Sequence, residues 1–298
     1  MCNFYHFCIS KDVLCYNFRM KFDFTFHSHT FRCGHADCDI PQLAQILYKH
    51  GFKIYGVSDH IFLPGIHHPR MRGDFSCLDE YISLFNKVKG EYKGKLDMYL
   101  GFEAEYIPHF YDYYLSLFKE KGFDYLICGQ HFVYDKEGNL DRYFGFDNFD
   151  SEEGIERYKN DLINAMKSGL FMYIAHPDLF FYTVTKVTPF IERITHEIID
   201  AAVEYDIPLE VNMCGAQSQK RFAQYGAIGY PASYFWEEVS KTNARVTVGG
   251  DFHSVNDPLD ADNFEYISQF IKNHNLKLCS PIEMYNNYKK KFKNKFNI

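Results

Sequence analysis

Histidine and carboxylate residues follow several short apolar runs of this chain, and their types and spacing suit the binding of metal ions. Glu103 follows one such run, Met98–Phe102, and histidines follow five others. The histidine segments are His27-Ser28-His29, Ser58-Asp59-His60, Gly129-Gln130-His131, His176-Pro177-Asp178 and Asp251-Phe252-His253. Metal ligands at the carboxyl ends of successive buried strands are how barrel enzymes assemble an active site. The pattern therefore predicts a multinuclear metal centre.

The one-residue spacing within two of these segments strengthens the prediction. Alternate side chains of an extended strand point to the same face, so His27 and His29 would aim two imidazoles at one point. Asp251 and His253 have the same spacing and supply a carboxylate with an imidazole. This combination suits borderline cations such as zinc, manganese and iron.

Glu103 is the candidate for a bridging ligand, since a carboxylate at the end of a buried strand needs a cationic partner and can bind two ions. Glu105 would share its face and is the alternative. Asp59 could accept a hydrogen bond from the His60 ring and orient it. Each histidine taken singly could be an ordinary polar loop residue, but their joint placement favours a metal site.

Composition narrows the class of protein. The chain has 298 residues, of which 46% are hydrophobic, enough for one large α/β domain with a sizeable core. Its net charge of −7 is dispersed, which argues against long nucleic acids as partners. The basic cluster Lys289–Lys295 is interpreted as a solvated last helical turn.

Cysteine usage and hydropathy indicate the compartment. The nine cysteines include no C-x-x-C pair, and free thiols in a reducing cytoplasm fit better than a disulfide framework. Cys33 could assist a metal, but the sequence favours a neutral loop thiol. Nothing approaches the roughly 18–20 apolar residues that span a bilayer, so we expect no membrane partner. The sequence carries no signal for an oligomeric state.

Strand-like and helix-like segments alternate along the chain, which predicts a parallel sheet in a single α/β domain. Strands are expected at 21–26, 53–58, 95–103, 124–130, 171–176, 208–212 and 245–250. Helices are expected at 41–50, 78–92, 110–121, 152–169, 189–205, 232–242 and 259–274. The intervening long loops are 27–40, 61–77, 131–150, 177–188 and 213–231. Residues 1–19 are expected to be an extension outside the domain 20–298, with Met20 as a plausible true start.

Four of the segments resemble the motifs of the PHP (polymerase and histidinol phosphatase) superfamily, in its stand-alone histidinol-phosphatase branch. They are His27-Ser28-His29, Asp59-His60, His176-Pro177-Asp178 and Asp251-Phe252-His253. The further branch features are Gly34-His35, Gly101-Phe102-Glu103 and Gly129-Gln130-His131-Phe132. The similarity extends from about Lys21 to the last predicted strand and its helix.

This resemblance implies a distorted (β/α)7 barrel with three divalent metal ions (zinc, iron or manganese). Carried over to this chain, the first ion would be bound by His27, His29, Glu103 and Asp251. The second would be bound by Glu103, His131 and His176. The third would be bound by His35, His60 and His253.

The implied activity is hydrolysis of a phosphate monoester, with L-histidinol phosphate as the first substrate to try. A hydroxide bridging two metal ions would attack phosphorus without a covalent protein nucleophile. Asp251 is the candidate for proton transfer, with His253 as the alternative. The remaining possibilities are another small ester (a nucleotide, a sugar phosphate or phosphotyrosine) and a non-catalytic, metal-binding regulatory protein.

Basic residues for the phosphate group are less evident. Several family members carry one shortly after the His-Pro-Asp motif, where this chain has the uncharged stretch Leu179–Thr183. Arg70, Arg72 and Arg221 are the chosen candidates in the predicted loops, and His67 and His68 lie near them. The other loop candidates are Arg32, Lys186 and Lys220.

Overall fold

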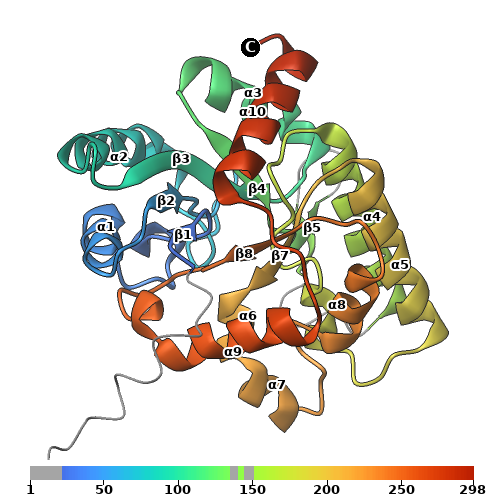
Figure 1. Cartoon of the computed structure of the whole chain (residues 1–298). Coiled ribbons are helices and arrows are strands. Elements are labelled where there is room, and N and C mark those ends of the chain that lie inside the picture. The colour runs from blue at the N-terminus through green and yellow to red at the C-terminus, as the bar shows by residue number, and fades with distance from the viewer. Residues whose placement is uncertain (1–21, 135–139, 144–150) are drawn as a thin grey trace, which may run out of the picture.

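Short runs rich in β-branched and aromatic residues pair as parallel strands at the centre of the molecule, and helices surround them (Figure 1). The computed structural model describes residues 22–134, 140–143 and 151–298, so the predicted extension 1–19 lies outside the described residues. The strands in chain order are β1 (Phe24–Thr25), β2 (Ile54–Val57), β3 (Asp97–Ala104), β4 (Tyr125–Cys128), β5 (Phe132–Tyr134), β6 (Leu140–Tyr143), β7 (Leu209–Asn212) and β8 (Val246–Gly249).

Parallel pairing joins most of these strands. β1, β2, β3 and β4 form one curled sheet in that order, and β7 pairs with β8. Isolated parallel bridges connect Ile174 to Cys128 on one side and to Leu209 on the other, and Ser28 to Phe252. β5 and β6 form an antiparallel ribbon. Every residue of β2, β4, β7 and β8 is buried, as expected for parallel strands covered by helices.

Helices follow most strands, and several begin at side-chain caps. Asp39 and Gln42 form a capping box at the first helix, and Thr188 caps a later one that starts with Pro189. The helices are α1 (Ile40–Lys49), α2 (Leu78–Glu91), α3 (Tyr111–Glu120), α4 (Glu152–Ser168), α5 (Pro189–Glu204), α6 (Met213–Gln217), α7 (Gln219–Gln224), α8 (Ser233–Ser240), α9 (Ala261–Asn273) and α10 (Pro281–Phe296). The 3-10 turns are η2 (Phe31–Cys33), η3 (Phe75–Cys77), η4 (Pro108–Phe110), η5 (Leu179–Tyr182) and η6 (Asp257–Leu259).

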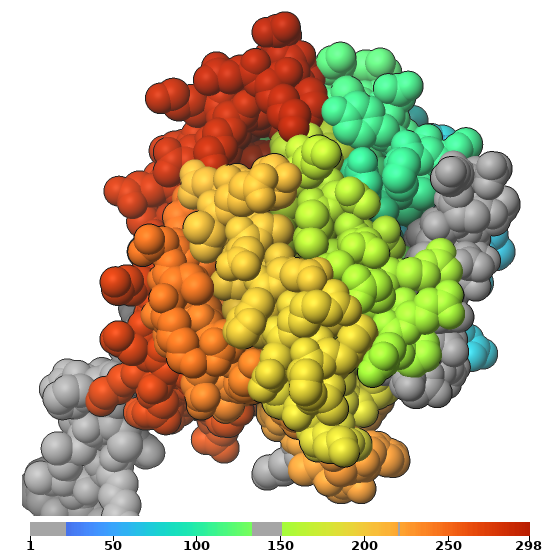
Figure 2. Space-filling view, turned by 90° about the vertical axis from the view of Figure 1, so that its right-hand side faces the viewer, coloured from blue at the N-terminus to red at the C-terminus, as the bar shows by residue number. Residues whose placement is uncertain are grey.

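The helices cover the outer side of the strands. α4 packs against α5, and α5 against α8, on the face seen in Figure 2. α10 lies near the amino end of β4, where Tyr285 Oη is 3.3 Å from Asp124 Oδ1. Its Phe292 ring packs against the Phe118 ring, with the two ring centroids 4.2 Å apart. In the part of the chain that the structure describes, no helix is long and apolar enough to cross a membrane.

The predicted α/β class is confirmed, with differences in detail. The expected strand at 171–176 pairs through two isolated bridges of Ile174 and through backbone hydrogen bonds from Met172 and Ala175 to β4. It ends at His176, which adopts a left-handed φ of 30° and is followed by Pro177, which has no N–H to donate. The predicted loop 213–231 contains α6 and α7, which are too short to show a helical period. The predicted loop 131–150 contains the β5–β6 ribbon.

α10 is much longer than the single helical turn predicted at Lys289–Lys295. A helical signal was present in the sequence, since Met284, Tyr288 and Phe292 recur every four residues and are all buried on α10. The many lysines and asparagines between them hid this apolar stripe.

An ion-pair network connects α4 to α5 and should make stability depend on pH. Glu156 is 2.6 Å from Arg193 and 2.7 Å from the nearly buried Lys159, and hydrogen bonds from these two residues lower the Glu156 pKa to about 2. A carboxylate with a depressed pKa stabilises the fold above its unfolded pKa, and this contribution is lost as the pH falls toward 2. We expect Glu156→Gln to cost about 0.5–1 kcal/mol at pH 7, because a third of the side chain is exposed to screening solvent.

Urea unfolding at pH 7 and pH 3 measures this effect. The cost should shrink at pH 3, and the same change at the exposed Glu237 should have little effect at either pH. A cost that is equal at both pH values would contradict the assignment.

Candidate metal centre

Glu103, near the carboxyl end of β3, is the central carboxylate of the site and is only 1% exposed. Its Oε1 is 2.8 Å from His176 Nε2 and 3.6 Å from His131 Nε2. Its Oε2 is 3.4 Å from His27 Nε2 and 3.5 Å from His29 Nε2. The two oxygens therefore face two different histidine pairs, as a bridging carboxylate would.

Asp251, two residues after β8, completes the group around the first histidine pair. Its Oδ1 is 3.0 Å from His29 Nε2 and 3.4 Å from His27 Nε2. Its Oδ2 accepts a hydrogen bond of 3.1 Å from Asn212 Nδ2. His27, His29 and Asp251 each offer one atom able to bind a metal ion, and these three atoms lie within 4.8 Å of one another.

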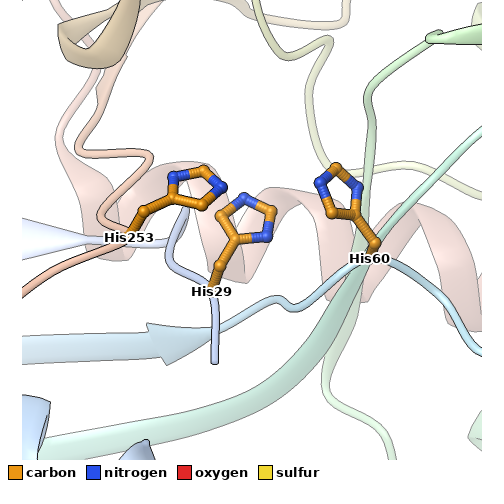
Figure 3. Close-up of side chains that lie close together, drawn as sticks. All are labelled: His29, His60 and His253. Carbon is orange, nitrogen blue, oxygen red and sulfur yellow. The ribbon is translucent and has the colours of Figure 1, made fainter. Parts of the chain in front are cut away.

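The remaining histidines extend the cluster toward solvent. Figure 3 shows the His29 ring between those of His253 and His60, with ring centroids 4.1 Å and 4.4 Å away. His60 Nδ1 also lies 3.0 Å from Glu103 Oε2. His35 is exposed, and its ring centroid is 4.7 Å from that of His253. The fold therefore brings all nine predicted ligand residues into one continuous cluster.

Several nitrogen and oxygen atoms of this cluster are buried and have no hydrogen-bond partner. They are His27 Nε2, both ring nitrogens of His29, Glu103 Oε2, His131 Nδ1, His176 Nδ1 and His253 Nε2. Each unsatisfied buried polar atom typically costs about 1–3 kcal/mol. Divalent cations would satisfy several of these atoms at once, and mixed imidazole and carboxylate donors suit zinc, iron and manganese. The residues present therefore fit a metal centre.

Glu210 of β7 supports the ligands and was not predicted. Its carboxylate lies 2.9 Å from His27 Nδ1, which leaves His27 Nε2 directed at the cluster. It also accepts a hydrogen bond of 3.0 Å from the His176 backbone N–H and one of 3.4 Å from Asn212 Nδ2. Glutamate and asparagine in the otherwise apolar run Leu209–Asn212 are the signal that could have identified this support.

Asp59 has a different role from the predicted one. Its Oδ1 lies 3.6 Å from the His29 Nδ1 atom, and its Oδ2 accepts from the Thr30 hydroxyl. From His60, the Asp59 side chain accepts a hydrogen bond only from the backbone N–H, at 2.9 Å. Asp59 therefore supports the His29 ring and the turn at His60, because the His60 ring points to Glu103.

Two residues of the centre adopt backbone conformations that side chains other than glycine rarely take. His176 has φ of 30° and Asp251 has φ of 51°. Such conformations persist where surrounding contacts hold them, and they concentrate at functional sites. Here the His176 N–H donates a hydrogen bond to the Glu210 carboxylate, and the Asp251 N–H donates one of 2.9 Å to the His27 carbonyl.

Burial and mutual charge control ionisation in the cluster. Burial would raise the pKa of Glu103, but His131, His27 and His60 outweigh it, so the Glu103 pKa lies well below its usual value. Burial, followed by the neighbouring His29, lowers the pKa of His253 to about 3. Glu103 is therefore anionic and His253 neutral at pH 7, the forms in which glutamate and histidine side chains can bind metal ions.

A cavity of about 540 Å³ opens over this cluster. Arg70 and Arg221 line it, and Arg221 Nη2 donates a hydrogen bond of 2.8 Å to the Tyr182 hydroxyl. Arg72, the third predicted anion ligand, is only 1% exposed and binds Glu105 at 2.9 Å, so its prediction as a phosphate contact is wrong. The same pairing explains why Glu105 is not the central carboxylate.

The other basic candidates lie elsewhere. Arg32 pairs with Asp39 at 2.7 Å and Glu80 at 2.8 Å. Lys186 is exposed and does not line the cavity, and the Lys220 side chain lies outside the described part of the chain.

Gly129 leaves room for the central carboxylate, and filling that room should disable the site. A Cβ at Gly129 would lie 1.8 Å from Glu103 Oε1. We expect Gly129→Ala to displace Glu103 and to weaken metal binding at least ~10–100-fold, the usual effect of losing a ligand's support. Calorimetric zinc titration measures the affinity. Gly90→Ala is the matched control, since no atom other than those of its chain neighbours and its own helix backbone lies within 4 Å of its Cβ position. Equal zinc affinity in the two variants would contradict the prediction.

Comparison with known proteins matches this chain to one family. The family model described as PHP domain matches residues 25–213, more than half of the chain. A probable histidinol-phosphatase of Deinococcus radiodurans is 30% identical over 168 residues, which cover 51% of this chain and 59% of that protein. The chain thus spans less than two thirds of this relative.

Two further proteins match over more of the chain. A probable phosphatase of Thermoanaerobacter sp. strain X514 is 24% identical over 261 residues, covering 85% of this chain and 87% of that protein. A crystal structure of histidinol phosphate phosphatase from Lactococcus lactis, complexed with zinc, L-histidinol and phosphate, aligns with a TM-score of 0.63. That alignment covers 86% of this chain and 94% of the other at 18% identity, so it concerns the fold.

Proposed function

Because the chain belongs to the PHP domain family, we propose that it is a metal-dependent phosphomonoesterase whose substrate is L-histidinol phosphate. The observation that carries the proposal is the convergence of nine imidazole and carboxylate side chains, six of which have a buried nitrogen or oxygen atom without a hydrogen-bond partner. The names of the relatives and the ligands of the Lactococcus lactis structure support the choice of substrate.

We allocate the ligands to three ions. The first would be held by His27, His29, Glu103 and Asp251. The second would be held by Glu103, His131 and His176. The third would be held by His35, His60 and His253. The division of the two Glu103 oxygens between two histidine pairs supports the first two sets.

The proposed scaffold is a distorted (β/α)7 barrel formed by residues 20–298. Residues 171–176 would take the place of its fifth strand, supported by the bridges of Ile174 to Cys128 and Leu209. The bridge between Ser28 and Phe252 supports closure of the barrel. The ligands then lie near the carboxyl ends of the strands.

The chain's own residues would orient the ester and move a proton. Divalent ions, when bound, lower the pKa of coordinated water to supply a hydroxide nucleophile and offset charge on the phosphoryl oxygens. Asp251 Oδ1 faces the cluster while its Oδ2 is held by Asn212, so Asp251 is positioned to accept or relay a proton. His253 is the alternative proton carrier.

Arg70 and Arg221 are the proposed phosphate contacts. Arg221 comes from α7 and is hydrogen-bonded to Tyr182, within the uncharged stretch Leu179–Thr183 where several family members have a basic residue. The helix thus supplies a guanidinium that this stretch lacks. We expect Arg221→Gln to raise KM about tenfold, since one charge-assisted hydrogen bond of about 1.5–3 kcal/mol is weakened. Steady-state kinetics measure this, and an unchanged KM would exclude Arg221.

The deciding experiment compares wild type with Asp251→Asn on p-nitrophenyl phosphate and on histidinol phosphate, with added manganese or zinc. We expect metal-dependent turnover of both esters by the wild type only. Equal background rates in the two proteins with every metal would favour a non-catalytic, metal-binding protein. Turnover of p-nitrophenyl phosphate alone would reassign the substrate to another small ester, such as a nucleotide, a sugar phosphate or phosphotyrosine.

A further inference from the structure

Cys33 lies directly beside the outer histidines and is not among the nine ligands. It ends the turn η2 and is fully buried, whereas His35 two residues later is exposed. The Cys33 sulfur and one ring nitrogen each from His35 and His253 lie within 4.8 Å of one another. A second such group joins the same sulfur to His29 and Asp59.

The nitrogens around the sulfur provide a second, independent indication of a ligand. His253 Nε2 and His29 Nδ1 are buried without a hydrogen-bond partner, and the His29 residue is only 1% exposed. His253 Nδ1 already lies 2.9 Å from the Asp251 carbonyl, so Nε2 is the nitrogen left to bind an ion. A buried nitrogen of this kind beside a sulfur is explained by a cation between them.

The loop holds the thiol and His35 in a fixed relation. Gly34 has φ of 82°, and a Cβ there would lie 2.2 Å from the Pro69 carbonyl oxygen, so no other residue fits without displacement. His35 Nδ1 lies 3.1 Å from the Cys33 carbonyl, which leaves Nε2 for an ion. Burial and the nearby Asp59 hold the pKa of the Cys33 thiol well above its usual value, so the thiol keeps its proton until a cation binds.

We propose that Cys33 is a further, thiolate ligand of the third and outermost metal ion, which it would bind in addition to His35, His60 and His253. On binding, the sulfur forms a bond to the ion and the thiol proton passes to solvent. Thiolate is a soft ligand, so the outer position selects zinc or iron over manganese, whereas the carboxylate-rich inner positions do not. This inference rests on the proposed function, because it requires that the centre bind metal ions.

The test uses the full-length protein in which cobalt replaces the native ions. A bound thiolate gives cobalt a near-ultraviolet charge-transfer band that imidazole and carboxylate ligands do not produce. We expect the band in wild type, its loss in Cys33→Ser, and its retention in Cys38→Ser. Cys38 is the matched control because it is a buried thiol of the same loop whose sulfur lies 3.9 Å from the His29 carbonyl.

X-ray absorption at the zinc edge of the wild-type protein supplies a reading that needs no variant. A sulfur neighbour is expected at about 2.3 Å from zinc. Bound cobalt without the band, a band that survives Cys33→Ser, or zinc without a sulfur neighbour would each overturn the role of Cys33 alone. A wild-type protein that binds no metal would instead overturn the proposed function together with it.

Discussion

Glu103→Gln is expected to remove essentially all phosphatase activity while leaving the fold intact. Glutamine has nearly the same shape, but it lacks the negative charge and presents only one oxygen. In the native site each Glu103 oxygen faces its own histidine pair, with His176 at 2.8 Å from Oε1 and His27 at 3.4 Å from Oε2. Losing one electrostatic partner of a reaction centre typically costs about 10²–10³-fold in rate, and the loss of a shared ligand should reach the upper end of that range.

Two measurements separate this expectation from a general loss of structure. Metal content after dialysis should fall below that of wild type, and the far-ultraviolet circular dichroism should be unchanged. Glu91→Gln, the same change at an exposed position on α2, is the control and should retain full activity. A Glu103→Gln protein with full metal content and a rate within tenfold of wild type would show that Glu103 does not bridge the ions.

Arg72→Met should produce the largest loss of stability. Arg72 and Glu105 are each 1% exposed, and Arg72 Nη2 lies 2.9 Å from Glu105 Oε1 while Nη1 donates 3.0 Å to the Ile61 carbonyl. Removing one partner of a buried pair leaves the other charge without compensation, which costs about 3–5 kcal/mol. Urea unfolding of the metal-loaded protein measures the free energy of unfolding.

Arg32→Met is the matched comparison for this loss. Arg32 is nearly buried as well, but of its two partners Glu80 has a side chain that is 66% exposed and can return to water when the arginine is removed. Asp39, 18% exposed, still accepts the hydrogen bond of 2.8 Å from the Ile40 N–H. We expect a cost of about 1 kcal/mol there. Adding Glu105→Gln to Arg72→Met should recover part of the lost stability, because the uncompensated charge is then gone. Equal costs at Arg72 and Arg32 would contradict the argument.

Local patterns in the sequence were sufficient for most of the fold. Parallel strands buried on both faces are recognisable as continuous apolar runs, and helices such as α1 carry both a cap and an apolar stripe. The segment at 171–176 was harder to delimit, because its pairing consists of the two isolated bridges of Ile174 and a few further backbone hydrogen bonds, and pairing depends on neighbours distant in the chain. α6 and α7 were missed because five or six residues cannot show a helical period.

The candidate ligand set could be predicted from the sequence because metal binding demands particular residue types at strand ends, and His27, His29, Glu103 and Asp251 fit that demand locally. The residues that support them were not visible. Glu210 is separated from His27 by 183 positions in sequence, yet its carboxylate holds the His27 ring. Only folding brings β7 beside the segment after β1, so no local pattern could assign that contact.

The arginines show the same division between sequence and tertiary structure. Arg70, Arg72 and Arg221 are equivalent in sequence, since each is a cation in a predicted loop on the active face. The tertiary structure buries Arg72 against Glu105 and leaves Arg70 and Arg221 lining the cavity. Residue type and spacing thus determined which side chains are candidates for binding metal ions. Partners and burial decided which charges face the cavity, because both depend on contacts between segments far apart in the chain.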